Sequence, residues 1–130
     1  CLVGVKLRNP KQQIDKADVI FRGDDTYFST AHTLSKIILE SPIDIKGYKL
    51  QYTFQKVTIT IDPVTSIFNP ETNLYETEFQ PAYKKEQTIK FNLGIQFATL
   101  ILFDTEGNKC TEFTNFPYNV VEKRAVDYQK

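Results

Sequence analysis

The stretch YKLQYTFQKVTITI, residues 48–61, decides the fold class, because apolar and polar side chains alternate along it. The apolar side chains first hold even positions: Tyr48, Leu50, Tyr52 and Phe54. They then hold odd positions: Val57, Ile59 and Ile61. A period of two is typical of a β-strand with one buried and one solvated face. The parity changes at Gln55-Lys56, and no Asn-Gly or Asp-Gly occurs there, so we expect a β-bulge rather than a tight hairpin.

A second alternating region covers residues 88–103, where odd positions are apolar almost throughout. From Ala98 onward the even positions are apolar as well, which predicts a strand buried on both faces. Sixteen residues exceed an ordinary strand, so Gly94 is expected to mark a bend. Residues 104–108 are rich in turn formers and predict a hairpin whose return strand covers residues 109–114.

Weaker alternation predicts further strands at residues 2–7, 16–22, 65–68, 74–79 and 118–122. Prolines punctuate these segments at Pro10, Pro70, Pro81 and Pro117 and are expected at sheet edges or in loops. One helix is expected near residues 31–38, where four residues share a helical stripe: Ala31, Leu34, Ile37 and Ile38. Ser29 or Thr30 would cap this helix, and Ser41-Pro42 would stop it.

This pattern predicts an all-β chain, namely a single antiparallel β-sandwich domain over residues 1–130 with one short helix. The sandwich would be immunoglobulin-like or transthyretin-like. The chain has no Trp, so the Cys-Trp-Cys hallmark of antibody domains is absent.

Composition argues against several classes of function. Sixteen basic and sixteen acidic side chains cancel, which disfavours nucleic-acid binding. The single histidine, His32, has no nucleophile and orienting group arranged around it in the sequence, and no phosphate-binding loop or metalloprotease motif occurs. We therefore predict no enzyme activity, no cofactor and no metal, and we interpret Asp24-Asp25 as a solvated turn rather than a calcium site.

The first residue of the sequence is Cys1, one of only two cysteines. In this position the chain resembles a mature bacterial lipoprotein. The resemblance implies a lipid anchor on Cys1 that holds the protein to the membrane, and Leu2 implies the outer membrane, on its periplasmic or surface face. A zinc site or a disulfide framework would need more cysteines, so we expect Cys110 to be a buried or half-buried free thiol.

These features predict a non-enzymatic, lipid-anchored structural subunit of a larger bacterial envelope assembly, such as a secretion or motility machine, with other envelope proteins as its partners. We expect partner contacts at aromatic and loop residues and near Pro117: Phe68, Asn69, Leu74, Tyr75, Phe116 and Tyr118. Residues 66–83 carry three glutamates and no base, whereas residues 1–16 are basic, a separation that could orient a subunit in an assembly. The alternative is a surface adhesin or glycan-binding module that uses aromatic loops or the tripeptide Arg22-Gly23-Asp24.

Overall fold

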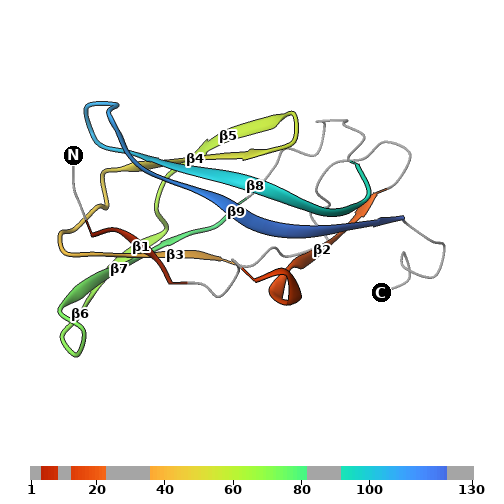
Figure 1. Cartoon of the computed structure of the whole chain (residues 1–130). Helices are drawn as coiled ribbons and strands as arrows, with labels where there is room; N and C mark the ends of the chain where they lie inside the picture. Colours follow the sequence, from red (N-terminus) through yellow and green to blue (C-terminus); the bar gives the residue numbers. More distant parts are fainter. Residues whose placement is uncertain (1–3, 9–12, 23–35, 82–91, 123–130) are drawn as a thin grey trace.

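The computed structural model describes residues 4–8, 13–22, 36–81 and 92–122, which form two β-sheets (Figure 1). The first sheet has the strand order β1 (Lys6–Leu7), β3 (Ile37–Ser41), β7 (Leu74–Phe79) and β6 (Thr65–Asn69). The second has the order β2 (Asp18–Arg22), β9 (Lys109–Glu122), β8 (Gly94–Phe103), β4 (Lys49–Phe54) and β5 (Val57–Ile61). Over the described ranges the only helical element is one 3-10 turn, η2 (Ile14–Lys16). The all-β prediction is confirmed.

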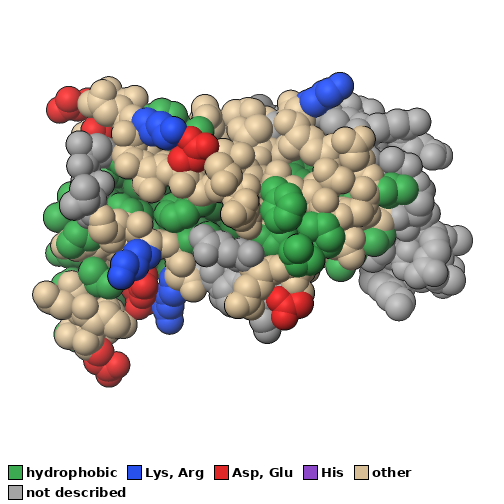
Figure 2. All heavy atoms as spheres, viewed as in Figure 1, with side chains coloured by type: hydrophobic (Ala, Val, Ile, Leu, Met, Phe, Trp, Pro, Cys, Tyr) green, Lys and Arg blue, Asp and Glu red, His purple; other side chains and the backbone are tan. Residues whose placement is uncertain are grey.

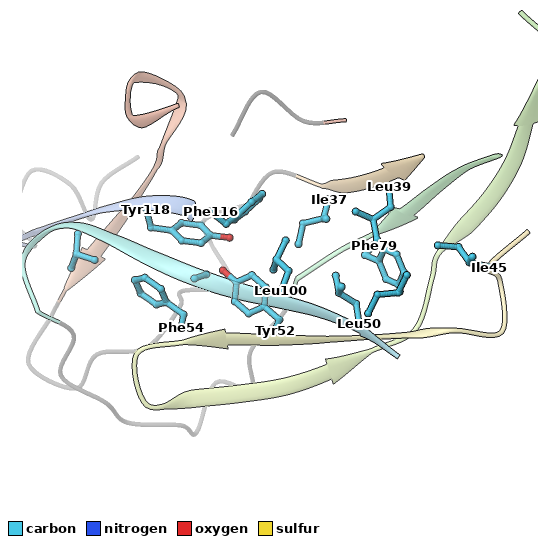
Figure 3. Close-up of a cluster of buried hydrophobic side chains, with 13 residues drawn as sticks. Ile37, Leu39, Ile45, Leu50, Tyr52, Phe54, Phe79, Leu100, Phe116 and Tyr118 are labelled. Carbon is cyan, nitrogen blue, oxygen red and sulfur yellow. The ribbon is translucent and has the colours of Figure 1, made fainter. Parts of the chain in front are cut away.

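One hydrophobic core joins the two sheets. Ile37, Leu39 and Phe79 of the first sheet belong to the same buried cluster as the inward residues of the second sheet. Figure 3 shows Leu39 and Phe79 close to Leu50 at one end of this cluster, and a group of aromatic rings at the other end. The alternation in residues 48–54 has the physical cause that we expected, because the even positions from Leu50 to Phe54 are fully buried.

The apolar pattern changes parity after Phe54 because the chain makes a tight hairpin there, so the predicted bulge is wrong. Phe54 pairs directly with Val57, which leaves Gln55 and Lys56 as a two-residue connection between β4 and β5. Gln55 adopts a left-handed conformation with φ of 54°. A non-glycine residue enters this region at a cost of roughly 1–2 kcal/mol. Pairing of β4 with β5 over five residue pairs outweighs this cost, so the turn forms without the usual Asn-Gly signal.

The predicted helix is contradicted where the structure describes it. Ile37 and Ile38 belong to strand β3, and Ser41, the expected stop signal, is the last residue of that strand. The other residues of the predicted helix lie outside the described part of the chain. A short apolar run fits either periodicity. Here pairing with β1 and β7 decides for a strand, because it buries alternate residues against the second sheet.

The hairpin predicted at residues 104–108 is confirmed, but its return strand is longer than expected. β9 runs for fourteen residues and includes Pro117, which we had expected at an edge or in a loop. The register between β8 and β9 shifts between Ala98 and Leu100, close to this proline. Pairing between β9 and β2 begins at Tyr118, one residue later. Pro117 therefore lies in an irregular part of the strand, where a missing backbone N–H is tolerated.

Two further expectations about the second sheet are wrong. β2 pairs with β9 in parallel, so the sheet is mixed rather than antiparallel. From Ala98 onward β8 is not buried on both faces, because Thr99, Ile101 and Phe103 are only half-buried. Gly94, with φ of 92°, begins β8 directly after a bend at Leu93, and residues 88–91 of the predicted strand lie outside the described part of the chain. The even positions Ala98, Leu100 and Leu102 face the core, and the odd positions face outward.

Candidate interaction site

β6 is the edge of the first sheet, and β7 is its only strand neighbour among the described residues. The backbone groups on the other side of an edge strand have no strand partner and can pair with an added strand. None of the five residues of β6 is charged. Pro63 and Pro70 flank the strand and limit the open edge to about five residues, or roughly 17 Å.

Apolar side chains accompany this edge. Ile67 is 63% exposed and Phe68 is 44% exposed, and Val64 just before the strand is exposed as well. The ring of Phe68 makes an edge-to-face contact with that of Tyr75 on β7, with 5.1 Å between the centroids. We name this set the β6 edge: Val64, Ile67, Phe68 and Tyr75. The structure thus brings together Phe68 and Tyr75, two of the predicted contact residues.

Two of the other three sheet edges of the described structure are better protected against strand addition. β1 is only two residues long, and β2 begins at Asp18 and ends at Arg22. β5 is as long as β6 and equally uncharged, but its exposed residues are Thr58 and Thr60, whereas β6 exposes apolar side chains. Short length and charges are devices that discourage edge pairing. β6 is therefore the edge best suited to accept a strand.

Asn69 and Leu74, two other predicted contact residues, shape the β6–β7 turn. The Asn69 side-chain oxygen accepts a hydrogen bond from the Glu71 N–H at 3.0 Å, and its carbonyl accepts one from the Asn73 N–H at 2.8 Å. Its side-chain amide also donates to Glu76 at 3.0 Å. Leu74 pairs with Asn69 and is half-buried. Asn69 therefore stabilises the turn, a role that the sequence around it did not indicate.

Phe116 and Tyr118 are core residues, so their prediction as partner contacts is wrong. Both are fully buried, and their rings contact each other with 5.6 Å between centroids. Tyr118 also packs against Phe54, at 5.1 Å, and Tyr52, at 6.2 Å. In Figure 3 the hydroxyls of Tyr52 and Tyr118 point toward each other. Burial raises the pKa of Tyr118 strongly, and the Tyr52 hydroxyl offsets part of this effect.

The glutamates of residues 66–83 do not form a separate acidic face. Glu76 forms an ion pair with Arg8 at 2.8 Å, and Glu78 forms one with Lys36 at 3.1 Å. Figure 2 likewise shows side chains of opposite charge next to each other. The basic and acidic segments of the sequence thus meet within the first sheet. Such exposed pairs contribute little stability, about 0–1 kcal/mol each.

A shallow hollow of about 260 Å³ lies at the β8–β9 hairpin on the outer face of the second sheet. Lys49, Gln51, Thr60 and Phe103 contribute to its lining, together with Asp104. Backbone N–H groups of Asn108 and Glu106 donate to the Asp104 carboxylate, and the bond from Asn108 is the main cause that lowers the pKa of Asp104. This carboxylate therefore organises the turn, and its oxygens are occupied by the backbone.

Several predicted residues lie outside the described part of the chain: Cys1, Gly23, Asp24, Asp25 and His32. Cys110 is half-buried as expected, but it is disulfide-bonded, so the predicted free thiol is wrong. Across the described ranges, no group of three or more histidine, cysteine, aspartate or glutamate side chains could hold a metal ion. The same residues include no helix long and apolar enough to cross a membrane.

Ile67 and Val64 were missed as candidate contacts. Their signal is an uncharged, partly apolar run between two prolines, but exposure depends on strand order, which the sequence does not state. Comparison with known proteins adds no assignment to this geometry: no protein-family model, no curated protein and no solved structure matches the chain.

Proposed function

We propose that this chain is a non-enzymatic interaction subunit that binds an extended segment of a partner protein along the β6 edge. The observation that carries the proposal is an uncharged, open strand edge with Ile67 and Phe68 exposed beside it. Backbone pairing would supply affinity, and Ile67 and Phe68, which lie on opposite faces of β6, would select apolar residues on both faces of the added strand. The two flanking prolines restrict the partner to a short strand.

The proposed scaffold is a β-sandwich of immunoglobulin-like or transthyretin-like kind. Its support is the hydrophobic core shared by the two sheets. In such a scaffold the core holds the edge strands rigid, so that β6 presents its backbone in a conformation ready for pairing. Preorganisation of this kind reduces the entropy lost on binding.

Replacement of Ile67 by lysine should abolish partner binding without unfolding the protein. Ile67 is largely solvent-exposed, so lysine is tolerated, whereas a charge on the strand disfavours addition of an apolar strand. We expect a loss of at least ~30-fold in affinity, the size of a hot-spot effect. The measurement is quantitative affinity purification from the source organism, followed by titration of the recovered partner with purified protein.

The matched control is Thr58→Lys, which places the same charge on β5, the edge of the second sheet. Thr58→Lys should recover the same partners as the wild type. Equal recovery by wild type and Ile67→Lys would contradict the proposal. Loss with Thr58→Lys alone would move the binding edge to β5.

The acyl anchor and the envelope location stay proposals that depend on Cys1. The chain has two cysteines, and one sulfur cannot carry both a thioether and a disulfide. Cys110 is disulfide-bonded in the structure. An intrachain disulfide of Cys110 would use the Cys1 sulfur, so such a disulfide and an acyl anchor on Cys1 exclude each other. Intact mass of the native protein separates them. We expect a mass increased by acyl chains on the Cys1 peptide if the anchor is present; a mass two hydrogens below that of the reduced chain contradicts it.

A further inference from the structure

The outward side of β8 is apolar although no described layer covers it. Ile95, Phe97, Ile101 and Phe103 alternate with the core residues of the same strand. Ile95 is 37% exposed and Phe97 is 46% exposed. β8 lies between β9 and β4, so these side chains occupy the middle of the second sheet rather than its edge (Figure 1). The solvated face of a sheet normally carries polar side chains at such positions.

Neighbouring strands extend this surface. Ile95 pairs with Asn119 on β9, and Asn119 pairs with Val19 on β2. Paired residues share a face of the sheet, so Val19, which is 44% exposed, lies on the same side as Ile95 at about 10 Å. On the other side, Thr99 pairs with Thr53 of β4. We name this surface the β8 face: Val19, Ile95, Phe97, Thr99, Ile101 and Phe103.

We infer that the β8 face binds the β8 face of a second copy of this chain. The first argument is charge. The charged side chains that flank the face are paired within the chain, Lys49 with Asp62 at 2.8 Å and Glu112 with Lys109. The chain as a whole has a formal net charge of zero. Nothing on the face selects a charged partner, and two identical neutral surfaces do not repel each other.

The second argument is shape and area. Two sheets with the same right-handed twist pack face to face at about −30°, so a sheet face finds a complementary shape in another copy of itself. From Ile95 to Phe103 the face is ~26 Å long, and the four strands from β2 to β4 span ~19 Å. Each copy would bury ~500 Å², or ~1,000 Å² in total, which is the size of a weak but specific interface. A weak dimer follows.

The dimer is tested by sedimentation equilibrium of the full chain between ~1 and ~100 µM, a range suited to an interface of this size. The measured mass of the wild type should rise from 15.0 kDa, the mass of one chain, toward twice that value as the protein concentration rises. Phe97→Lys should weaken dimerisation by at least ~30-fold, because it buries an unpaired charge at the centre of the face. Ile95→Lys should act in the same direction and serves as the second variant.

The matched control is Ile67→Lys, which adds the same charge to the β6 edge and should leave the dimer intact. Circular dichroism checks that each variant is folded. A wild type that stays monomeric throughout the range, or a dimer that Phe97→Lys leaves unchanged, would overturn the inference. A dimer lost with Ile67→Lys alone would also overturn it and place the contact between copies at β6. The inference would also be overturned if the wild type were a monomer that binds neutral phosphatidylcholine vesicles and if Phe97→Lys abolished this binding. The inference is independent of the partner proposed for β6.

Discussion

Truncation of Phe54 to alanine is expected to lower the free energy of unfolding by about 3–5 kcal/mol. Phe54 is fully buried on β4, and its ring packs edge-on against Tyr118 of β9. Removal of the ring loses its transfer free energy and leaves a cavity among aromatic side chains that cannot collapse onto it. Domains of this size are stable by only about 5–15 kcal/mol, so the loss is a large share of the total. Urea denaturation followed by circular dichroism measures it.

The neighbouring residue provides the control for this prediction. Thr53 lies on the opposite face of the same strand, where its hydroxyl contacts that of Thr58 at 3.1 Å. Thr53→Ala should cost about 1 kcal/mol or less, since it removes one exposed contact and some β propensity. Phe54→Leu keeps most of the volume and gives a measurable value if the alanine variant does not fold. Equal losses for Phe54→Leu and Thr53→Ala would contradict the placement of Phe54 in the core.

Tyr118 should make the protein sensitive to alkaline pH. Burial raises the pKa of Tyr118 in the folded state above the value near 10 of an unfolded chain. Above pH 10 the unfolded state therefore releases the proton first, and the folded state binds more protons than the unfolded one. Raising the pH then favours unfolding, with a contribution from Tyr118 of at most about 1.4 kcal/mol per pH unit. Below pH 10 this stability is fully present.

The test compares wild type and Tyr118→Phe by urea denaturation from pH 8 to pH 11. At pH 8 the variant should be less stable, because the Tyr52 hydroxyl loses its neighbour, by about 1 kcal/mol. The difference should shrink or reverse as the pH rises above 10, since the variant has no phenol to ionise at this position. Tyr75→Phe at the β6–β7 hairpin controls for loss of a hydroxyl. Parallel curves for wild type and Tyr118→Phe across the range would contradict the prediction.

The candidate site was only partly predictable from the sequence. Phe68 and Tyr75 were expected at an interface because they are aromatic residues next to a loop, and the structure places them together on the β6–β7 hairpin. Phe116 and Tyr118 are likewise a phenylalanine and a tyrosine with a proline nearby, yet they fill the core. Nothing in the neighbouring sequence distinguishes the exposed pair, Phe68 and Tyr75, from the buried pair. The difference is that β6 is an edge, whereas β9 lies between two other strands.

The sequence by itself determined the all-β class, the inward side of β4, and the hairpin at residues 104–108. These follow from short-range rules, since a period of two and turn residues act over a few positions. Tertiary structure alone decided that residues 37–41 form a strand, that β4 and β5 meet in a tight turn, and that β2 runs parallel to β9. It also decided which apolar residues stay exposed. Those outcomes depend on pairing between segments far apart in the chain, whose energies outweigh local preferences of about 1 kcal/mol.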